Sequence, residues 1–414
     1  MKRTKKACKW QSKQRTTMHI TNCRRLGRIL PMHKSITQSV LVVLLVGFTT
    51  SVFGQPLDTI LPKRRWIEQF YPANLVKRDF RFLPVPSLSN TPETGLKGGV
   101  ALSYFFNANE KDTLKKARDS YAYLDVQYST MQQLFVELYA QTFTSGEKFF
   151  IRGRVGYSDN VERIWGFGNA TQPNNKFETV LYERTYLQAS VLRKVKQGFF
   201  VGGKVNMSNM YNLENTVKDS NILAGLPGAK QSFVAGIGPT IIWDHRNHPL
   251  ATMRGWYTEL AIVFHSPALG SKFMYTDVVF DARKYFPIGK KAALAVQGFA
   301  NLTNGTTPWR EMPRMGSGSI MRGYFGGRFR DNQYLAAQAE ARVPVHKLVT
   351  LAGFAAVGQV QSKLGNLSLT DNKFAFGGGV RILANAKKQI MVRLDYGITT
   401  DGNRGFYIKL GEAF

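Results

Sequence analysis

The side chains best suited to catalysis or metal binding in this 414-residue chain lie in the stretch WDHRNHPL, residues 243–250. Its carboxylate and two imidazoles, from Asp244, His245 and His248, are groups that could bind a metal ion weakly. The stretch separates two segments of alternating pattern, however, and the polarity of a turn explains its composition better. We therefore expect no metal site there.

Motifs of known enzyme classes give no further candidate. His265 and His346 fall at the ends of alternating segments, and neither lies beside a Ser or Asp at a spacing typical of a catalytic triad. The sequence contains no GxSxG, P-loop or HExxH motif. The glycines at 377–379 lie inside an alternating segment, where they ease the curvature of a sheet. We expect no catalytic residues, no cofactor and no enzymatic activity.

A different kind of chemistry is indicated by residues 321–345, MRGYFGGRFRDNQYLAAQAEARVPV. A loop rich in glycine and arginine, carrying Arg322, directly precedes an alternating segment with Glu340 in its middle. A guanidinium removed from water is strongly unfavourable unless a carboxylate pairs with it. Glu340 is thus a candidate partner of Arg322 if the loop folds inward. Alternatively, the loop is solvated and Glu340 only balances Arg342 on the same segment.

The elements that would position these residues are strands of period two. In FYIKLGEAF, residues 406–414, the apolar side chains Phe406, Ile408, Leu410 and Phe414 share one face of a predicted strand. Such segments are about ten residues long, whereas strands of soluble sheets commonly have about five or six. Segments of about ten residues with aromatic ends are typical of tilted transmembrane strands. The fold class is therefore predicted to be an all-β, transmembrane antiparallel β-barrel.

Sixteen segments of this kind can be counted, an even number as expected for a closed bacterial barrel. They are residues 80–89, 96–106, 118–130, 134–143, 148–160, 179–194, 198–211, 231–244, 255–265, 272–286, 291–301, 334–345, 349–360, 373–384, 389–399 and 404–414. We therefore assign residues 80–414 to the barrel.

The connections between the segments alternate in length. Those near residues 145, 196, 288, 346 and 386 are short, and 107–117 is the exception on that side. The long connections, at 161–178, 212–230, 302–333 and 361–372, belong to the alternate set. Short periplasmic turns and long external loops are the outer-membrane pattern. The longest loop, which carries Arg322, is thus predicted to be external.

The N-terminal region is predicted to be a leader. From Met32 it has a short charged region, an apolar core and small residues before a cleavage site between Gly54 and Gln55, which indicates a secretory signal peptide. The apolar run is shorter than the roughly 20 residues of a membrane-spanning helix. We assign residues 1–54 to this leader, with either Met1 or Met32 as the true start, and 55–79 to a short periplasmic lead-in.

Charge and cysteine content agree with export. The formal charge is +29, but ten Lys and Arg lie within residues 1–31 and the remaining excess is spread evenly. No basic helix or nucleic-acid-binding motif is present, so we expect no nucleic-acid partner. Both cysteines, Cys8 and Cys23, lie in the leader, and a body without cysteine fits an oxidising compartment.

Four motifs resemble the BamA/TamA barrels, also called the bacterial surface antigen family. MRGY at 321–324 is similar to the VRGF or VRGY signature of that family's sixth external loop, and PETGLKGG at 92–99 to its opening motif. WGFGN at 165–169 and AEARVPV at 339–345 resemble two further motifs in the same order. The resemblance covers residues 75–414. It implies that Arg322, Gly323 and Tyr324 form the loop signature and that Arg322 reaches Glu340 inside the barrel.

Two departures from the family pattern limit what the resemblance implies. The family often has an Asp on the thirteenth strand, where FAAVG at 354–358 has Ala356. Glu340 is thus left as the main candidate partner of Arg322. Members that insert or secrete proteins also carry POTRA repeats, which we do not find in this sequence.

The resemblance implies a function in outer-membrane protein assembly or translocation, in the outer membrane of a diderm bacterium. The expected partners are membrane lipid and lipopolysaccharide, the barrel assembly machinery and a separate periplasmic protein. The assembly machinery would recognise the last strand through Phe406, Ile408, Leu410 and Phe414. The alternative is a passive channel or surface barrel without insertase activity, since a basic body favours anions.

Overall fold

The computed structural model describes residues 82–106, 118, 120–215, 222–289, 291–386 and 389–414. The predicted leader, its cleavage site at Gly54 and Gln55, the lead-in 55–79 and the connection 107–117 lie outside the described residues.

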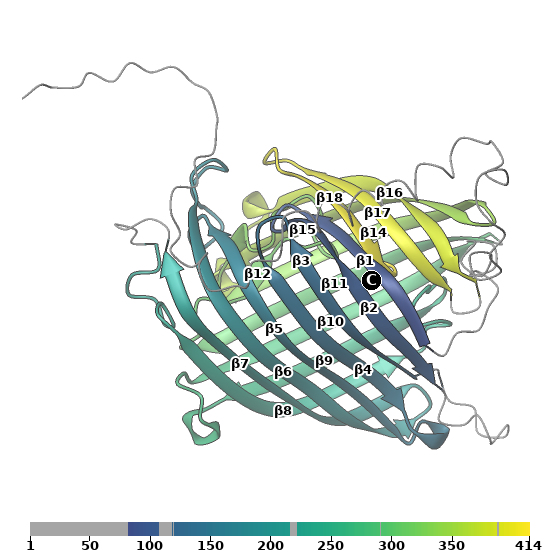
Figure 1. Cartoon of the computed structure of the whole chain (residues 1–414), viewed down its shortest axis with the longest axis horizontal. Coiled ribbons are helices and arrows are strands. Elements are labelled where there is room, and N and C mark those ends of the chain that lie inside the picture. The colour runs from purple at the N-terminus through teal and green to yellow at the C-terminus, as the bar shows by residue number, and fades with distance from the viewer. Residues whose placement is uncertain (1–81, 107–117, 119, 216–221, 290, 387–388) are drawn as a thin grey trace, which may run out of the picture. The chain divides into compact units, whose positions relative to one another are not determined.

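Sixteen strands form one antiparallel sheet in the order of the chain (Figure 1). They are β1 (Phe82–Thr91), β2 (Gly95–Phe106), β3 (Ser120–Ser129), β4 (Leu134–Phe143), β5 (Phe149–Ile164), β6 (Glu178–Lys196), β7 (Phe199–Asn215), β8 (Ser232–Asp244), β9 (Gly255–His265), β10 (Tyr275–Ile288), β11 (Ala292–Gly305), β14 (Gln333–His346), β15 (Val349–Gln361), β16 (Lys373–Asn385), β17 (Ile390–Thr399) and β18 (Arg404–Leu410). The predicted all-β fold with sixteen barrel strands is confirmed. A separate pair, β12 (Arg314–Met315) and β13 (Phe329–Arg330), lies within the connection between β11 and β14.

The sheet curls into a nearly closed barrel. Its two end strands, β1 and β18, lie side by side (Figure 1). The side-chain amide of Asn90 donates a hydrogen bond to the carbonyl oxygen of Phe406 at 3.0 Å. Among the described residues, a backbone hydrogen-bond ladder joins each strand to the next in sheet order. No such ladder joins β1 to β18. We call this boundary the seam.

Alternation gives the barrel an apolar outer face and a polar inner one. On β3, Leu124, Val126 and Tyr128 are exposed on the outside. Inward residues of the same strand are hydrogen-bonded to neighbours, as in the bond from the Tyr123 hydroxyl to Glu137 at 3.0 Å. This arrangement is the one expected of a barrel that meets lipid outside and encloses a polar interior. No helix in the described part of the chain is long and apolar enough to span a membrane.

The last strand is shorter than predicted. β18 ends at Leu410, and Gly411 takes a φ of 78°, in the left-handed region, which turns the chain away from the strand direction. Phe414 is consequently 6% exposed and packs with Tyr285 and Ala295, whereas Phe406 and Leu410 are each 42% exposed. The prediction that Phe414 shares the outer face with Phe406 and Leu410 is therefore wrong.

Candidate functional site

The connection between β11 and β14, which we call the RGY loop (306–332), folds onto the inner wall of the barrel. Its residues Met315, Met321, Tyr324 and Phe329 are almost fully buried. They pack against inward side chains of β14, β15 and β16: Tyr334, Ala336, Ala356, Val360 and Ala375. Burial of this apolar contact removes the loop from solvent and fixes its position.

Two glycines allow the loop backbone to lie directly against β17. Gly323 has a φ of 114°, and a Cβ there would stand 2.8 Å from the Cγ2 atom of Thr399. On the facing strand, a Cβ at Gly397 would stand 2.6 Å from the carbonyl oxygen of Arg322. Neither position has room for a side chain, so the close approach requires glycine on both elements.

The contact places Arg322 between two carboxylates. Its Nη1 atom lies 2.7 Å from Oε2 of Glu340 on β14 and 2.7 Å from Oδ2 of Asp395 on β17. The guanidinium carbon stands 3.5 Å from the ring centroid of Phe354 on β15, a cation–π contact. All three charged side chains are fully buried. The structure thus brings together Arg322 and Glu340, and it adds Asp395.

Three further arginines share these carboxylates. Arg342 lies 2.8 Å from Glu340, Arg381 lies 3.0 Å from Glu340 and 2.5 Å from Asp395, and Arg393 lies 3.0 Å from Asp395. We call this the luminal charge cluster, and it consists of Arg322, Arg342, Arg381, Arg393, Glu340, Asp395 and Glu412. Glu340 and Asp395 each contact three of the guanidinium groups, and Glu412 contacts two. Each carboxylate is therefore essential to several arginines.

The RGY loop also contacts both sides of the seam. The backbone N–H of Gly323 donates to the hydroxyl of Tyr407 on β18 at 2.9 Å. The backbone N–H of Gly326 donates to the carboxylate of Glu93, in the turn between β1 and β2. The loop thereby links β18 to the β1–β2 turn, on the two sides of the seam.

The WGFGN stretch contacts the RGY loop at Phe325 and Arg330. The backbone N–H of Gly168 donates to the carbonyl oxygen of Arg330 at 2.8 Å. The ring of Trp165 meets that of Phe325 edge-on at 4.9 Å between centroids. One of the motifs that carried the family resemblance thus contacts the RGY loop just after the MRGY motif.

A second buried carboxylate, Glu162 on β5, binds three more of the loop arginines. Arg310 and Arg314 lie 3.4 Å from it, Arg330 pairs with it, and the hydroxyl of Tyr182 donates to it. This centre was missed in the sequence, although a loop with five arginines requires carboxylates if it is buried. The excess of arginine in the loop was the available signal.

Glu311 of the loop makes a further anchor with Arg184 on β6 at 3.1 Å. Burial alone would raise the pKa of the Glu311 carboxyl, but the charges of Arg184 and Arg310 and a hydrogen bond from Ser208 lower that pKa below its ordinary value. The carboxylate is therefore charged at neutral pH.

Asp395 was the main residue that sequence reasoning missed. The family pattern directed attention to Ala356 on β15, which here is an apolar contact of the loop. The second carboxylate comes instead from β17, where Arg393 and Asp395 occupy the same inward face. Two charges on one face of an otherwise apolar strand were the signal that could have found it.

The groups first considered for metal binding are occupied by protein contacts. The carboxylate of Asp244 lies 2.8 Å from Arg118 and 2.9 Å from Arg246. The Nδ1 atom of His248 accepts a hydrogen bond from the backbone of Leu250 at 3.2 Å. Among the described residues, no group of three His, Cys, Asp or Glu side chains could hold a metal ion.

Comparison with known proteins gives both a family and a fold. The Omp85 superfamily domain matches residues 93–414. No curated protein sequence matches the chain.

Solved barrels similar to this chain have low sequence identity. BamA from Haemophilus ducreyi lacking POTRA domains 1-3 is 13% identical with a TM-score of 0.53, over 81% of this chain and 71% of that one. CdiB from Acinetobacter baumannii is 10% identical with a TM-score of 0.52, over 80% and 60%. CdiB from Escherichia coli is 9% identical with a TM-score of 0.54, over 80% and 63%. This chain thus spans less than two thirds of either CdiB chain, and the likeness is one of fold.

Proposed function

The chain belongs to the Omp85 superfamily, and on this premise we propose that it is an outer-membrane barrel that assembles or translocates other proteins. The observation that carries the proposal is the seam. In the described residues β1 and β18 are adjacent without a backbone ladder, and the side chain of Asn90 provides a bond across them.

An unpaired strand edge in lipid is unfavourable, because its N–H and C=O groups have no water to bond. The same edge is a template on which a strand of another protein can add. A seam held by side-chain contacts and by the RGY loop is therefore suited to opening, whereas a seam with a full ladder is not. Opening would require release of the contacts at Tyr407 or Glu93.

The luminal charge cluster would keep the loop in place while the seam opens. Breaking a buried ion pair typically costs about 3–5 kcal/mol, because the partner is left charged and unpaired. Arg322 pairs with carboxylates on β14 and β17, so the loop stays attached to the C-terminal strands. The loop's contact with the β1–β2 turn, through Glu93, is the one that would separate.

The location and partners follow from the same proposal. Residues 1–54 would direct export and be removed between Gly54 and Gln55. The assembly machinery would recognise the outward side chains Phe406, Ile408 and Leu410 of β18. The apolar outer face would contact lipid and lipopolysaccharide, and a periplasmic partner would deliver client proteins.

The direct test is the folding of a client in liposomes. The purified protein would be reconstituted, an unfolded outer-membrane barrel added, and its folding followed by heat-modifiability on gels. The proposal predicts faster folding than in empty liposomes. Equal rates, together with a large and steady anion-selective conductance in planar bilayers, would instead support a passive channel.

A further inference from the structure

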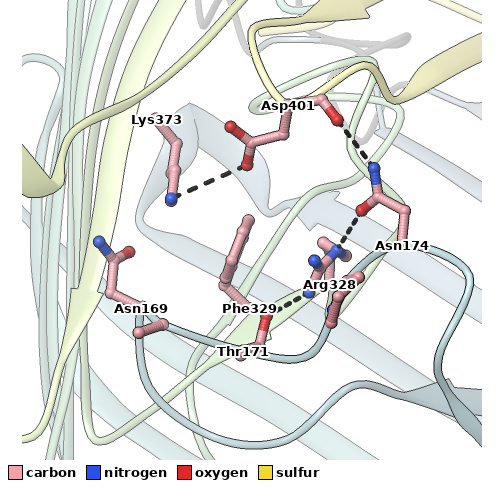
Figure 2. Close-up of a pocket in the computed structure, with 9 residues that line it drawn as sticks. Asn169, Thr171, Asn174, Arg328, Phe329, Lys373 and Asp401 are labelled. Atoms are coloured by element: carbon pink, nitrogen blue, oxygen red, sulfur yellow. Dashed lines mark hydrogen bonds and ion pairs between the residues drawn. The ribbon is translucent and has the colours of Figure 1, made fainter.

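A pocket of about 360 Å³ opens where three external connections meet the start of β16 (Figure 2). Its polar lining comes from Asn169, Thr171, Asn174, Arg328, Lys373 and Asp401. The volume is near the lower end of the range for small-molecule sites, which is roughly 300–1,000 Å³. The luminal charge cluster and the seam contribute no lining residue, so this pocket is a separate feature.

Arg328 brings a positive charge that no acid neutralises directly. Its side chain is 4% exposed, and its Nε atom donates to the Asn174 side chain at 2.9 Å. Its other donors bond to the hydroxyl of Thr171 and, at 2.8 Å, to the carbonyl oxygen of Gln172. In the part of the chain that the structure describes, no carboxylate lies within ion-pair distance of Arg328. All of its bonds are to neutral groups.

Lys373 adds a second cation on the other side of the Phe329 ring (Figure 2). Its Nζ atom lies 3.8 Å from Oδ2 of Asp401, a loose ion pair whose side chains are 23% and 27% exposed. Two cations thus face one carboxylate, and the pocket keeps an excess of positive charge. Lys373 is accessible enough to pair with an acid that enters from outside.

The neutral groups of the lining are amides and a hydroxyl. The Asn169 amide nitrogen donates to the carbonyl oxygen of Asp371 at 2.6 Å, and the Asn174 amide nitrogen donates to the carbonyl oxygen of Asp401 at 2.8 Å. An amide nitrogen carries two hydrogens, so each of these side chains keeps one donor for an oxygen atom of a ligand. Amide side chains beside cations therefore suit a molecule with both hydroxyl groups and an acidic group.

We propose that this pocket binds an anionic saccharide at the external face of the barrel, with Lys373 pairing its acidic group and the amides of Asn169 and Asn174 donating to its hydroxyl oxygens. A neutral sugar would leave the positive charge uncompensated, and inorganic phosphate would leave much of the volume unfilled. The proposal needs only the orientation in which the long loops face outward. It does not depend on client assembly.

Binding can be measured on the full chain in detergent by titration calorimetry, with the fluorescence of Trp165 as a second readout, since its ring lies 5.2 Å from Arg328. The probes are glucuronate, glucose 6-phosphate, glucose and inorganic phosphate. We expect saturable binding of both acidic sugars. Glucose and phosphate should bind more weakly, by about tenfold or more. Phosphate as tight as glucuronate would overturn the saccharide assignment, and no saturable binding of either acidic sugar would overturn the site.

Substitutions place the site within the fold. Lys373→Met is expected to weaken the binding of glucuronate by about tenfold. Lys272→Met, which changes an exposed lysine of the β9–β10 connection, is the matched control and should leave binding unchanged. Asn169→Ala is a second variant that keeps both cations. It should weaken the binding of glucuronate, while heat-modifiability on gels shows that the barrel is still folded. Unchanged affinity in both pocket variants would contradict the proposal.

Discussion

At the scale of single residues, the fold of the RGY loop depends on charges that lie out of water. Arg322 has two carboxylate partners, and each of these serves further arginines. The contributions of the seven charged side chains are consequently not additive, because removing one changes the balance of all.

The two members of the predicted pair should differ in their effect. Arg322→Ala leaves Glu340 with Arg342 and Arg381, whereas Glu340→Ala leaves three arginines with fewer carboxylates. We expect Glu340→Ala to destabilise the barrel by about 3–5 kcal/mol and Arg322→Ala by less. The temperature at which each variant's band shifts on gels would show which substitution destabilises the barrel more. The double variant should lose less stability than the sum of the two single losses.

Gly323 provides a prediction of steric origin. Gly323→Ala places a methyl group 2.8 Å from Thr399 at a φ of 114°, so the loop must move away from β17. Gly353→Ala is the control, since a Cβ there meets nothing within 4 Å. Limited proteolysis should cut the RGY loop in the first variant and not in the second. Equal resistance of both variants would show that the loop does not lie against β17.

At the scale of elements, the RGY loop is held by anchors on β14, β17, β18 and the β1–β2 turn. Tyr407→Phe removes the hydroxyl that accepts from Gly323, and Glu93→Gln weakens the contact with Gly326. Each change should reduce the free energy that holds the loop against the seam by about 1–3 kcal/mol, while the strands remain folded. Increased cleavage of the loop with an unchanged circular-dichroism spectrum would be the expected result. A loss of strand signal would mean that these residues support the barrel itself.

Acid should release the anchor at Glu311. Because its folded-state pKa lies below the ordinary value of 4.5, the carboxylate contributes stability that is fully present above that pH and lost as the pH falls below it. Proteolysis of the loop by an acid-active protease should therefore increase below pH 4.5 in the native protein. Glu311→Gln should already be cleaved at neutral pH and show a smaller change with acid.

The elements themselves could be predicted well from the sequence. The sixteen strands follow from period-two alternation, since each residue faces either lipid or the interior. The end of β18 could not, because FYIKLGEAF continues the alternation past Leu410 and only the conformation of Gly411 breaks it. Alternation could have identified Asp395 as an inward charge of β17, but its pairing with Arg322 could not be predicted, since it depends on how the curled sheet brings β17 to the loop.

At the scale of the whole molecule, the loop and its arginines fill part of the interior beside the C-terminal strands. A barrel with this content should conduct ions weakly in planar bilayers. Removing residues 306–332 and joining β11 to β14 by a short glycine linker should raise the conductance several-fold. A native protein that already shows a large, steady conductance would contradict the position of the loop.

The central claim is that the seam between β1 and β18 opens during function. The most direct measurement is client folding in liposomes with a disulfide across the seam, made from Asn90→Cys and Phe406→Cys, and compared with a disulfide between the paired strands β9 and β10, made from Leu260→Cys and Phe280→Cys. We predict that oxidation stops client folding for the seam pair, that reduction restores it, and that the control pair is active in both states. Client folding that continues at the same rate with the seam cross-linked would contradict the claim.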